Sequence, residues 1–209
     1  NYFLILSLGA MLIGFAPIFV KWSLLSSSAI AFYRMFLTIP FLFGLNYLLN
    51  GKLKFQVKNK RTIIYAAFAS LAFTTDLTLW HYSMGITSVS NATIIVNSAP
   101  IFVAILSFIF FKEKLSKGFV ISFLVTYLGI VGLIYYSNNY INGKLLGDIL
   151  CMIAAFFYAV YLLVIARLGK ENSLNIIFYT TLFCCLFSIV PMLIEGGNIF
   201  PSSKFEWIN

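Results

Sequence analysis

The chain has 209 residues, of which 61% are hydrophobic and only 10% are charged, and its formal net charge is +8. Soluble domains usually carry about 25% charged residues, and a mean hydropathy of +0.97 leaves too little polar surface to keep this chain in water. The composition therefore excludes a soluble globular protein and predicts an integral membrane protein.

Seven apolar runs of about 19 to 22 residues follow one another, and each can cross a hydrocarbon core of about 30 Å as a helix. Only helices and closed barrels satisfy their backbone polar groups inside a bilayer, and continuously apolar rather than alternating runs favour helices. Short connections place neighbouring spans antiparallel, so we predict an all-α polytopic membrane protein. The predicted spans are residues 2–20, 29–49, 62–82, 90–111, 118–136, 145–166 and 174–194.

Most of the positive charge lies in alternate connections between these spans. The positive-inside rule makes those connections cytoplasmic, and the N-terminus with them. A nucleic-acid surface would not skip every second connection, so no nucleic-acid partner is expected. We expect a multi-pass protein of a cell membrane, and long apolar helices with cytoplasmic lysines suit a bacterial inner membrane. The basic residues concerned are Lys52, Lys54, Lys58, Lys60, Arg61, Lys112, Lys114, Lys117, Arg167 and Lys170.

The sequence carries no enzyme or metal-binding signature. The single histidine, His81, has no Cys, Asp or Glu at ligand spacing, and the chain contains neither GxSxG nor HExxH. Of the acidic residues only Asp76 lies well inside a predicted span, so paired acids for intramembrane hydrolysis are not expected. Cys151, Cys184 and Cys185 lie in predicted spans and are expected to behave as small apolar residues. We therefore expect no enzyme, no cofactor and no metal.

A weak internal repeat relates the two ends of the chain. A shift of 146 residues lays Phe32 and Tyr33 on Phe178 and Tyr179, so that the first two spans fall on the sixth and seventh. The copies are five spans apart, and an odd number inverts the second copy relative to the first. An inverted repeat of five spans predicts ten in total. This chain supplies seven, so we expect it to be truncated.

Several motifs occur in a characteristic order. These are D-L-T-L-W-H-Y at residues 76–82, T-S-V-S-N-A-T at 87–93, N-S-A-P at 97–100, F-K-E-K-L-S at 111–116, G-I-V-G at 129–132, G-D at 147–148 and A-A-F-F-Y-A-V-Y at 154–161. The first five resemble the end of an EamA domain, the repeat unit of the drug/metabolite transporter superfamily. The last two resemble the opening of a second such domain, so the resemblance covers essentially the whole chain.

This resemblance implies a ten-helix carrier with both termini cytoplasmic. Residues 1–136 would form the first EamA repeat, and residues 145–209 the start of the second, with helices eight to ten absent. Small organic solutes would move by alternating access through a central cavity between the inverted halves. Substrates in this superfamily include amino acids, other metabolites and drugs, and the motifs do not name the solute.

The third span carries the most polar chemistry. Asp76 and Trp80 are four residues apart and share a helix face, whereas His81 lies about 140° from Asp76. A carboxylate in a membrane span normally faces a protein interior or a wet cavity, so we predict that Asp76 and Trp80 line the solute path. Alternatively, Asp76 pairs with Arg34 and Trp80 only packs. His81 could relay protons, or it could place its polar edge in the headgroups or the vestibule.

Two further spans supply candidate solute contacts. Asn97 precedes Pro100, which frees the carbonyl of Val96 and predicts a kink or an exposed acceptor. That carbonyl and the Asn97 amide would bind a polar solute or, alternatively, cross-link helices. Tyr158 and Tyr161 share a helix face beside small alanines, so they are predicted to form an aromatic cavity wall, with simple packing as the alternative.

The predicted partners are a small-molecule solute and the lipid bilayer. Any proton coupling is predicted to run through Asp76, and the sequence leaves both a monomer and a homodimer open. Glu113, at the cytoplasmic mouth of the fourth span, is expected to pair with nearby lysines. The main rival to a carrier is a membrane sensor or assembly subunit, and a saturable solute flux would separate the two.

Overall fold

The structure is a computed structural model that describes residues 7–9, 11, 14–15, 17–18, 20, 22–51, 53–57, 59–112, 116–140, 145–169 and 171–200. The predicted first span, residues 2–20, and Glu113 therefore lie largely or wholly outside the described residues. The same holds for Lys21, Lys52, Lys58, Lys114, Lys144, Lys170 and Lys204.

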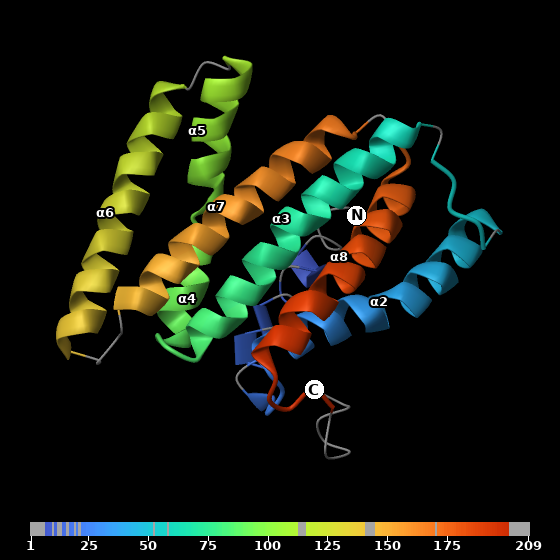
Figure 1. Cartoon of the computed structure of the whole chain (residues 1–209). Coiled ribbons are helices and arrows are strands. Elements are labelled where there is room, and N and C mark those ends of the chain that lie inside the picture. Colours follow the sequence, from blue (N-terminus) through green and yellow to red (C-terminus); the bar gives the residue numbers. More distant parts are fainter. Residues whose placement is uncertain are drawn as a thin grey trace.

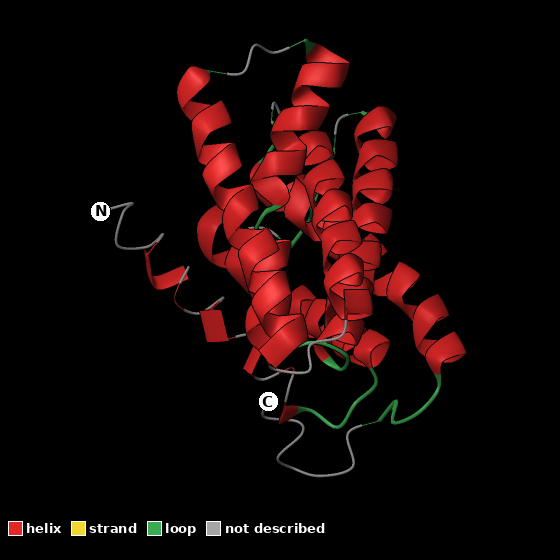
Figure 2. Cartoon of the chain, turned by 90° about the vertical axis from the view of Figure 1, so that its left-hand side faces the viewer, coloured by secondary structure: helices red, strands yellow, loops and turns green. Residues whose placement is uncertain are grey.

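Every regular element within the described ranges is a helix (Figure 2), so the predicted all-α class is confirmed. Five stretches are long and apolar enough to cross a membrane, and α4 and α5 together form one of them. Helix α6 has a shorter apolar stretch, Lys117–Gly132. The helices are α2 (Ser27–Asn50), α3 (Lys60–Met84), α4 (Val89–Val96), α5 (Ala99–Phe111), α6 (Lys117–Tyr140), α7 (Leu145–Arg167) and α8 (Ser173–Glu195).

Helix α3 lies at the centre of the bundle, packed against α7 on one side and α8 on the other (Figure 1). Helix α2 packs on α8, whereas α4 and α5 pack on α7. Helix α6 lies at the outer edge. The element that carries Asp76, Trp80 and His81 is thus the most enclosed part of the fold.

Small side chains make this close packing of helices feasible. Ala66 and Ala69 on α3 and Ala154, Ala155 and Ala159 on α7 are almost completely buried. Small residues let helix backbones approach closely in a membrane, where apolar burial alone does not drive association. Large apolar side chains point outward instead, as expected of a surface that faces lipid tails. Examples are Phe36, Phe41, Leu48, Ile64 and Phe110.

The predicted fourth span is interrupted, as the proline in it indicates. Helix α4 ends at Val96, and α5 begins at Ala99 with Pro100 in its first turn. Proline is favoured at that position because its missing N–H would have no helical partner there. The predicted kink is therefore confirmed as a break at Asn97 and Ser98.

The two ends of the bundle differ in charge. At one end lie the start of α3, the ends of α5 and α7 and the start of α6 (Figure 1), and we call this the basic end. It carries five described cations: Lys60, Arg61, Lys112, Lys117 and Arg167. At the opposite end Glu195 of α8 accepts hydrogen bonds from the backbone N–H groups of Ser27, at 3.0 Å, and Ser28, at 2.8 Å. This carboxylate caps α2, whose own N-cap residue makes no side-chain cap bond.

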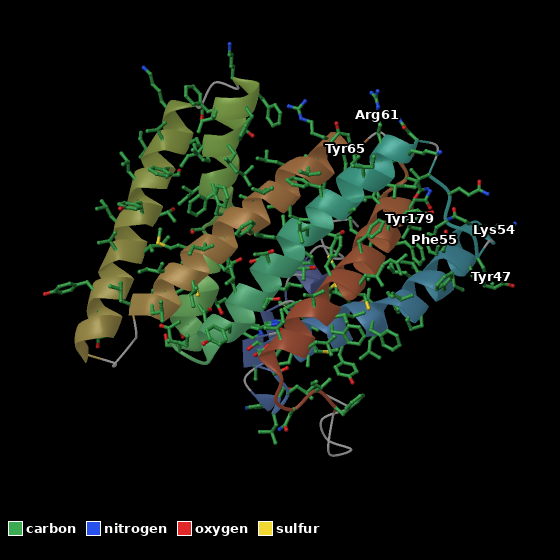
Figure 3. The ribbon with its side chains drawn as sticks, viewed as in Figure 1. Tyr47, Lys54, Phe55, Arg61, Tyr65 and Tyr179 are labelled. Atoms are coloured by element: carbon green, nitrogen blue, oxygen red, sulfur yellow. The ribbon has the colours of Figure 1, made fainter. Side chains whose placement is uncertain are left out.

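The connection between α2 and α3 docks onto α8. Phe55 stacks on Phe178 with ring centroids 3.9 Å apart, and the Tyr179 hydroxyl donates to the Phe55 carbonyl at 3.3 Å. Figure 3 shows Tyr179 and Phe55 side by side, with Lys54 further out. The segment between α2 and α3 therefore anchors α2 to α8.

Candidate functional site

A largely buried polar cluster joins the start of α2 to the last turns of α3. Nη1 of Arg34 lies 3.1 Å from Nε2 of His81, and Nδ1 of His81 lies 3.2 Å from the carbonyl oxygen of Ser27. A guanidinium can only donate, so Nε2 accepts and the protonated Nδ1 donates to Ser27. His81 is only 3% exposed. The ring is therefore held within the bundle through both of its nitrogens.

Asp76 lies one turn and a half before His81 on α3 and is 5% exposed. Its carboxylate lies close enough to the Arg34 guanidinium for their charges to interact. Its Oδ1 atom has no hydrogen-bond partner among the described residues. Since buried polar atoms nearly always have partners, this oxygen marks a position where a further group could bind.

Trp80, on the next turn of α3, also has a buried polar atom without a hydrogen-bond partner among the described residues. Its ring is half-buried and packs against a core of small and aliphatic side chains that includes Met84, Ala92 and Cys151. The indole Nε1, however, is buried without a hydrogen-bond partner in the described part of the chain. Trp80 therefore combines an apolar stacking face with an unused donor.

Two tyrosines of α7 continue this aromatic surface. The rings of Tyr158 and Tyr161 are nearly parallel, with centroids 6.0 Å apart. Phe73 of α3 stacks on Tyr161 at 4.6 Å and lies 6.1 Å from Tyr158. Tyr158 also lies close enough to Asp76 for the charge of the carboxylate to act on the tyrosine hydroxyl. The structure thus brings Asp76, Trp80, His81, Tyr158 and Tyr161 to the interface of α3 with its neighbours.

Asn97 makes no hydrogen bond to a residue of this cluster within the described part of the chain. It is exposed at the break between α4 and α5, and its side-chain amide donates to the Thr93 carbonyl of its own helix at 2.7 Å. The amide therefore satisfies a local backbone group, and neither a solute contact nor a cross-link between helices follows from its geometry.

A second buried carboxylate escapes the sequence reasoning. Asp148 is fully buried in the first turn of α7, and its Oδ1 accepts from Thr87 Oγ1 at 2.7 Å and from Asn91 Nδ2 at 3.4 Å. Its Oδ2 has no partner in the described ranges. Gly147 lets this contact form, because a Cβ at that position would lie 2.8 Å from Thr87 Cβ. The Gly147–Asp148 pair in the motif is the signal that could have pointed to it.

Two cavities are described, and none of the six predicted site residues lines either one. The first, of about 790 Å³, lies at the basic end between α3, α5 and α7. The second, of about 810 Å³, lies between the end of α2, the segment that follows it and the start of α8. Neither a group of His, Cys, Asp and Glu suited to a metal nor a disulfide occurs among the described residues.

Comparison with known proteins adds to this geometry. The family model for EamA-like transporters matches residues 2–135, which is more than half of the chain. The chain belongs to the EamA-like transporter family. A curated relative from Acidianus ambivalens, named an uncharacterized transporter in the sor 3′ region, is 28% identical over 137 residues. Those residues are 65% of this chain and 53% of the relative, so the chain spans about half the relative's length. No solved structure matches the chain.

Membership in the EamA-like family agrees with the five membrane-length helices. Together they identify a multi-pass membrane protein of transporter type, in the drug/metabolite transporter superfamily as the motifs indicate. The match ends at residue 135, close to the predicted end of the first repeat. The division into two inverted repeats stays a prediction.

Proposed function

We propose that this EamA-like protein is a secondary transporter that moves small organic solutes by alternating access, and that its solute path passes the cluster formed by Arg34, Asp76, Trp80, His81 and Tyr158. The observation that carries the proposal is that two of the buried polar atoms without a partner among the described residues, Asp76 Oδ1 and Trp80 Nε1, lie one helical turn apart on α3. Ionisable groups inside a membrane span are costly, and they usually mark a solute or ion path.

The chemistry of the cluster favours a solute that has both a polar or cationic group and an apolar body. Asp76 offers an oxygen acceptor, and Trp80 offers an N–H donor beside its ring. Tyr158, Tyr161 and Phe73 supply an aromatic wall, against which rings and aliphatic chains pack well. Amino acid-like metabolites and amphipathic drugs have this combination of groups.

We further propose that any coupling to protons uses Asp76. Arg34 donates from Nη1 to His81, and no hydrogen bond from a described residue reaches Oδ1 of Asp76. His81 makes hydrogen bonds through both ring nitrogens, which suits a fixed structural role. Asp76 is therefore the group in this cluster that is best placed to exchange a proton when a solute enters or leaves.

Counterflow in proteoliposomes tests alternating access. The full-length protein would be reconstituted and screened with pooled radiolabelled amino acids, nucleoside-type metabolites and cationic drugs. A carrier predicts saturable uptake that unlabelled solute inside the vesicles accelerates, because the loaded site returns faster than the empty one. Flux that does not saturate would indicate a channel, and absence of flux from folded protein would favour a sensor or assembly subunit.

A further inference from the structure

The cavity at the basic end is a groove with apolar walls and a cationic rim. Its walls are formed by α3, α5 and α7 and include Tyr65, Phe68, Phe110 and Phe156. These side chains are between 39% and 71% exposed, so the groove is open along its length. Arg61 and Arg167 line its end, where α3 begins and α7 finishes. Figure 3 shows Arg61 and Tyr65 at this end of α3.

Both arginines are available to a ligand. No hydrogen bond or ion pair to the Arg61 guanidinium is present within the described residues. The Arg167 guanidinium lies over the Phe111 ring, 3.5 Å from its centroid, an arrangement that leaves its N–H edge open. Glu171 also lines this rim, but its Oε1 accepts from Thr62 Oγ1 at 3.3 Å, and it forms no ion pair with either arginine. Two cations against one carboxylate leave the rim positive.

The depth of the groove matches one leaflet of a bilayer. On α7 its lining runs from Phe156 to Arg167, which at 1.5 Å per residue is about 16 Å. Half of a hydrocarbon core of about 30 Å is about 15 Å. The arginines would then lie at headgroup level, while the aromatic walls would reach to the middle of the membrane.

We propose that this groove binds an anionic phospholipid, with its phosphate held by Arg61 and Arg167 and an acyl chain lying along α3, α5 and α7. A guanidinium binds phosphate oxygens in a planar, bidentate manner. Basic pockets between membrane helices bind anionic headgroups, and the basic end is the one that the positive-inside rule places toward the anionic cytoplasmic leaflet. This lipid site is separate from the solute cluster around Asp76.

Native mass spectrometry of the delipidated full-length protein in detergent tests the site. The probes are phosphatidylglycerol and phosphatidylcholine with the same acyl chains. The double variant Arg61→Gln with Arg167→Gln should bind phosphatidylglycerol about 30-fold more weakly, because each arginine near an anionic lipid surface contributes about fivefold. Binding of phosphatidylcholine should change little. Both arginines are exposed, so the variant should fold, and its melting temperature would verify this.

A matched control removes two charges from the same end without touching the groove. Lys60 and Lys117 are exposed and line neither cavity, so Lys60→Gln with Lys117→Gln should keep most of the preference for phosphatidylglycerol. An equal loss in this control would overturn the site in favour of diffuse surface charge. Equal binding of the two lipids by the unaltered protein, or binding of neither because other segments cover the groove, would also overturn it.

A competition experiment distinguishes a lipid site from a site for a soluble anion. Glycerophosphoglycerol has the phosphatidylglycerol headgroup but no acyl chains, so it should not displace the lipid at equal concentration. Displacement by it would overturn the lipid assignment and indicate a site for soluble organic anions. The proposed solute path does not depend on any of these results, because it is tested by flux and by residues of the Asp76 cluster.

Discussion

Nη1 of Arg34 lies 3.1 Å from Nε2 of His81, although the two residues are 47 positions apart in the chain. The second ring nitrogen of His81 donates to the Ser27 carbonyl at 3.2 Å. A single imidazole therefore orients Arg34 and also ties the first turn of α2 to α3. This arrangement sets the position of the guanidinium whose charge acts on Asp76.

The first prediction concerns this imidazole. His81→Phe keeps a ring of similar size but leaves the Ser27 carbonyl and the Arg34 guanidinium without their partner. An unmet hydrogen-bonding group in a buried site costs about 1–3 kcal/mol, so the free energy of unfolding should fall by about that amount. Unfolding in detergent micelles measures it. Tyr82→Phe is the control, because Tyr82 is the exposed neighbour. Equal stability of the two variants would refute the role given to His81.

The second prediction concerns the contact between Gly147 and Thr87. Gly147→Ala places a Cβ 2.8 Å from Thr87 Cβ and 3.0 Å from the Thr87 backbone nitrogen, so α7 must shift away from the start of α4. Overpacking of this kind costs about 1–3 kcal/mol, and the melting temperature should drop. Gly132→Ala on α6, where no atom lies within 4 Å of the added Cβ, should keep it or raise it slightly. A fall in both variants would mean that the packing argument fails.

The third prediction concerns the cap on α2. Glu195→Ala removes the acceptor of two backbone N–H groups, those of Ser27 and Ser28. Loss of a helix cap costs about 0.5–2 kcal/mol. Glu195→Gln keeps one acceptor oxygen, so its stability should lie between that of the unaltered protein and that of Glu195→Ala. Thermal unfolding measures the three stabilities. If the alanine variant matches the unaltered protein, the contact does not stabilise the helix end.

The fourth prediction concerns coupling. Asp76→Asn has nearly the same shape but cannot exchange a proton, so uptake driven by a pH gradient should be lost. Exchange of solute at equal pH on both sides should persist, because it needs no net proton movement. Flux assays in proteoliposomes with and without a gradient separate the two. A variant that still accumulates solute in response to the gradient would rule out Asp76 as the coupling group.

Hydropathy was sufficient to predict the helices from α2 to α8, because a membrane span must be long, apolar and internally hydrogen-bonded. Pro100 likewise indicated the interruption of the fourth span, since proline acts on its own helix. The pairing of His81 with Arg34 was beyond sequence reasoning. It depends on how α2 lies against α3, and helix periodicity gives only the face on which a residue stands.

Asp148 escaped prediction for a related reason. Its place in the first turn of α7 suggests a residue near the membrane surface, yet Thr87 of the α3–α4 connection and Asn91 of α4 contact it, and it is fully buried. The groove at the basic end was also missed, because Arg61 and Arg167 are 106 positions apart and meet only when α3 and α7 pack antiparallel.

The central claim, that the solute path passes the cluster on α3, is tested most directly by the flux of one variant. Trp80→Ala removes the ring and the unused indole donor. Phe41→Ala removes a 69% exposed ring from the lipid-facing side of α2 and serves as the control. We predict that saturable solute flux is lost in Trp80→Ala and kept in Phe41→Ala, with both variants folded. Full flux with an unchanged Michaelis constant in Trp80→Ala would contradict the account.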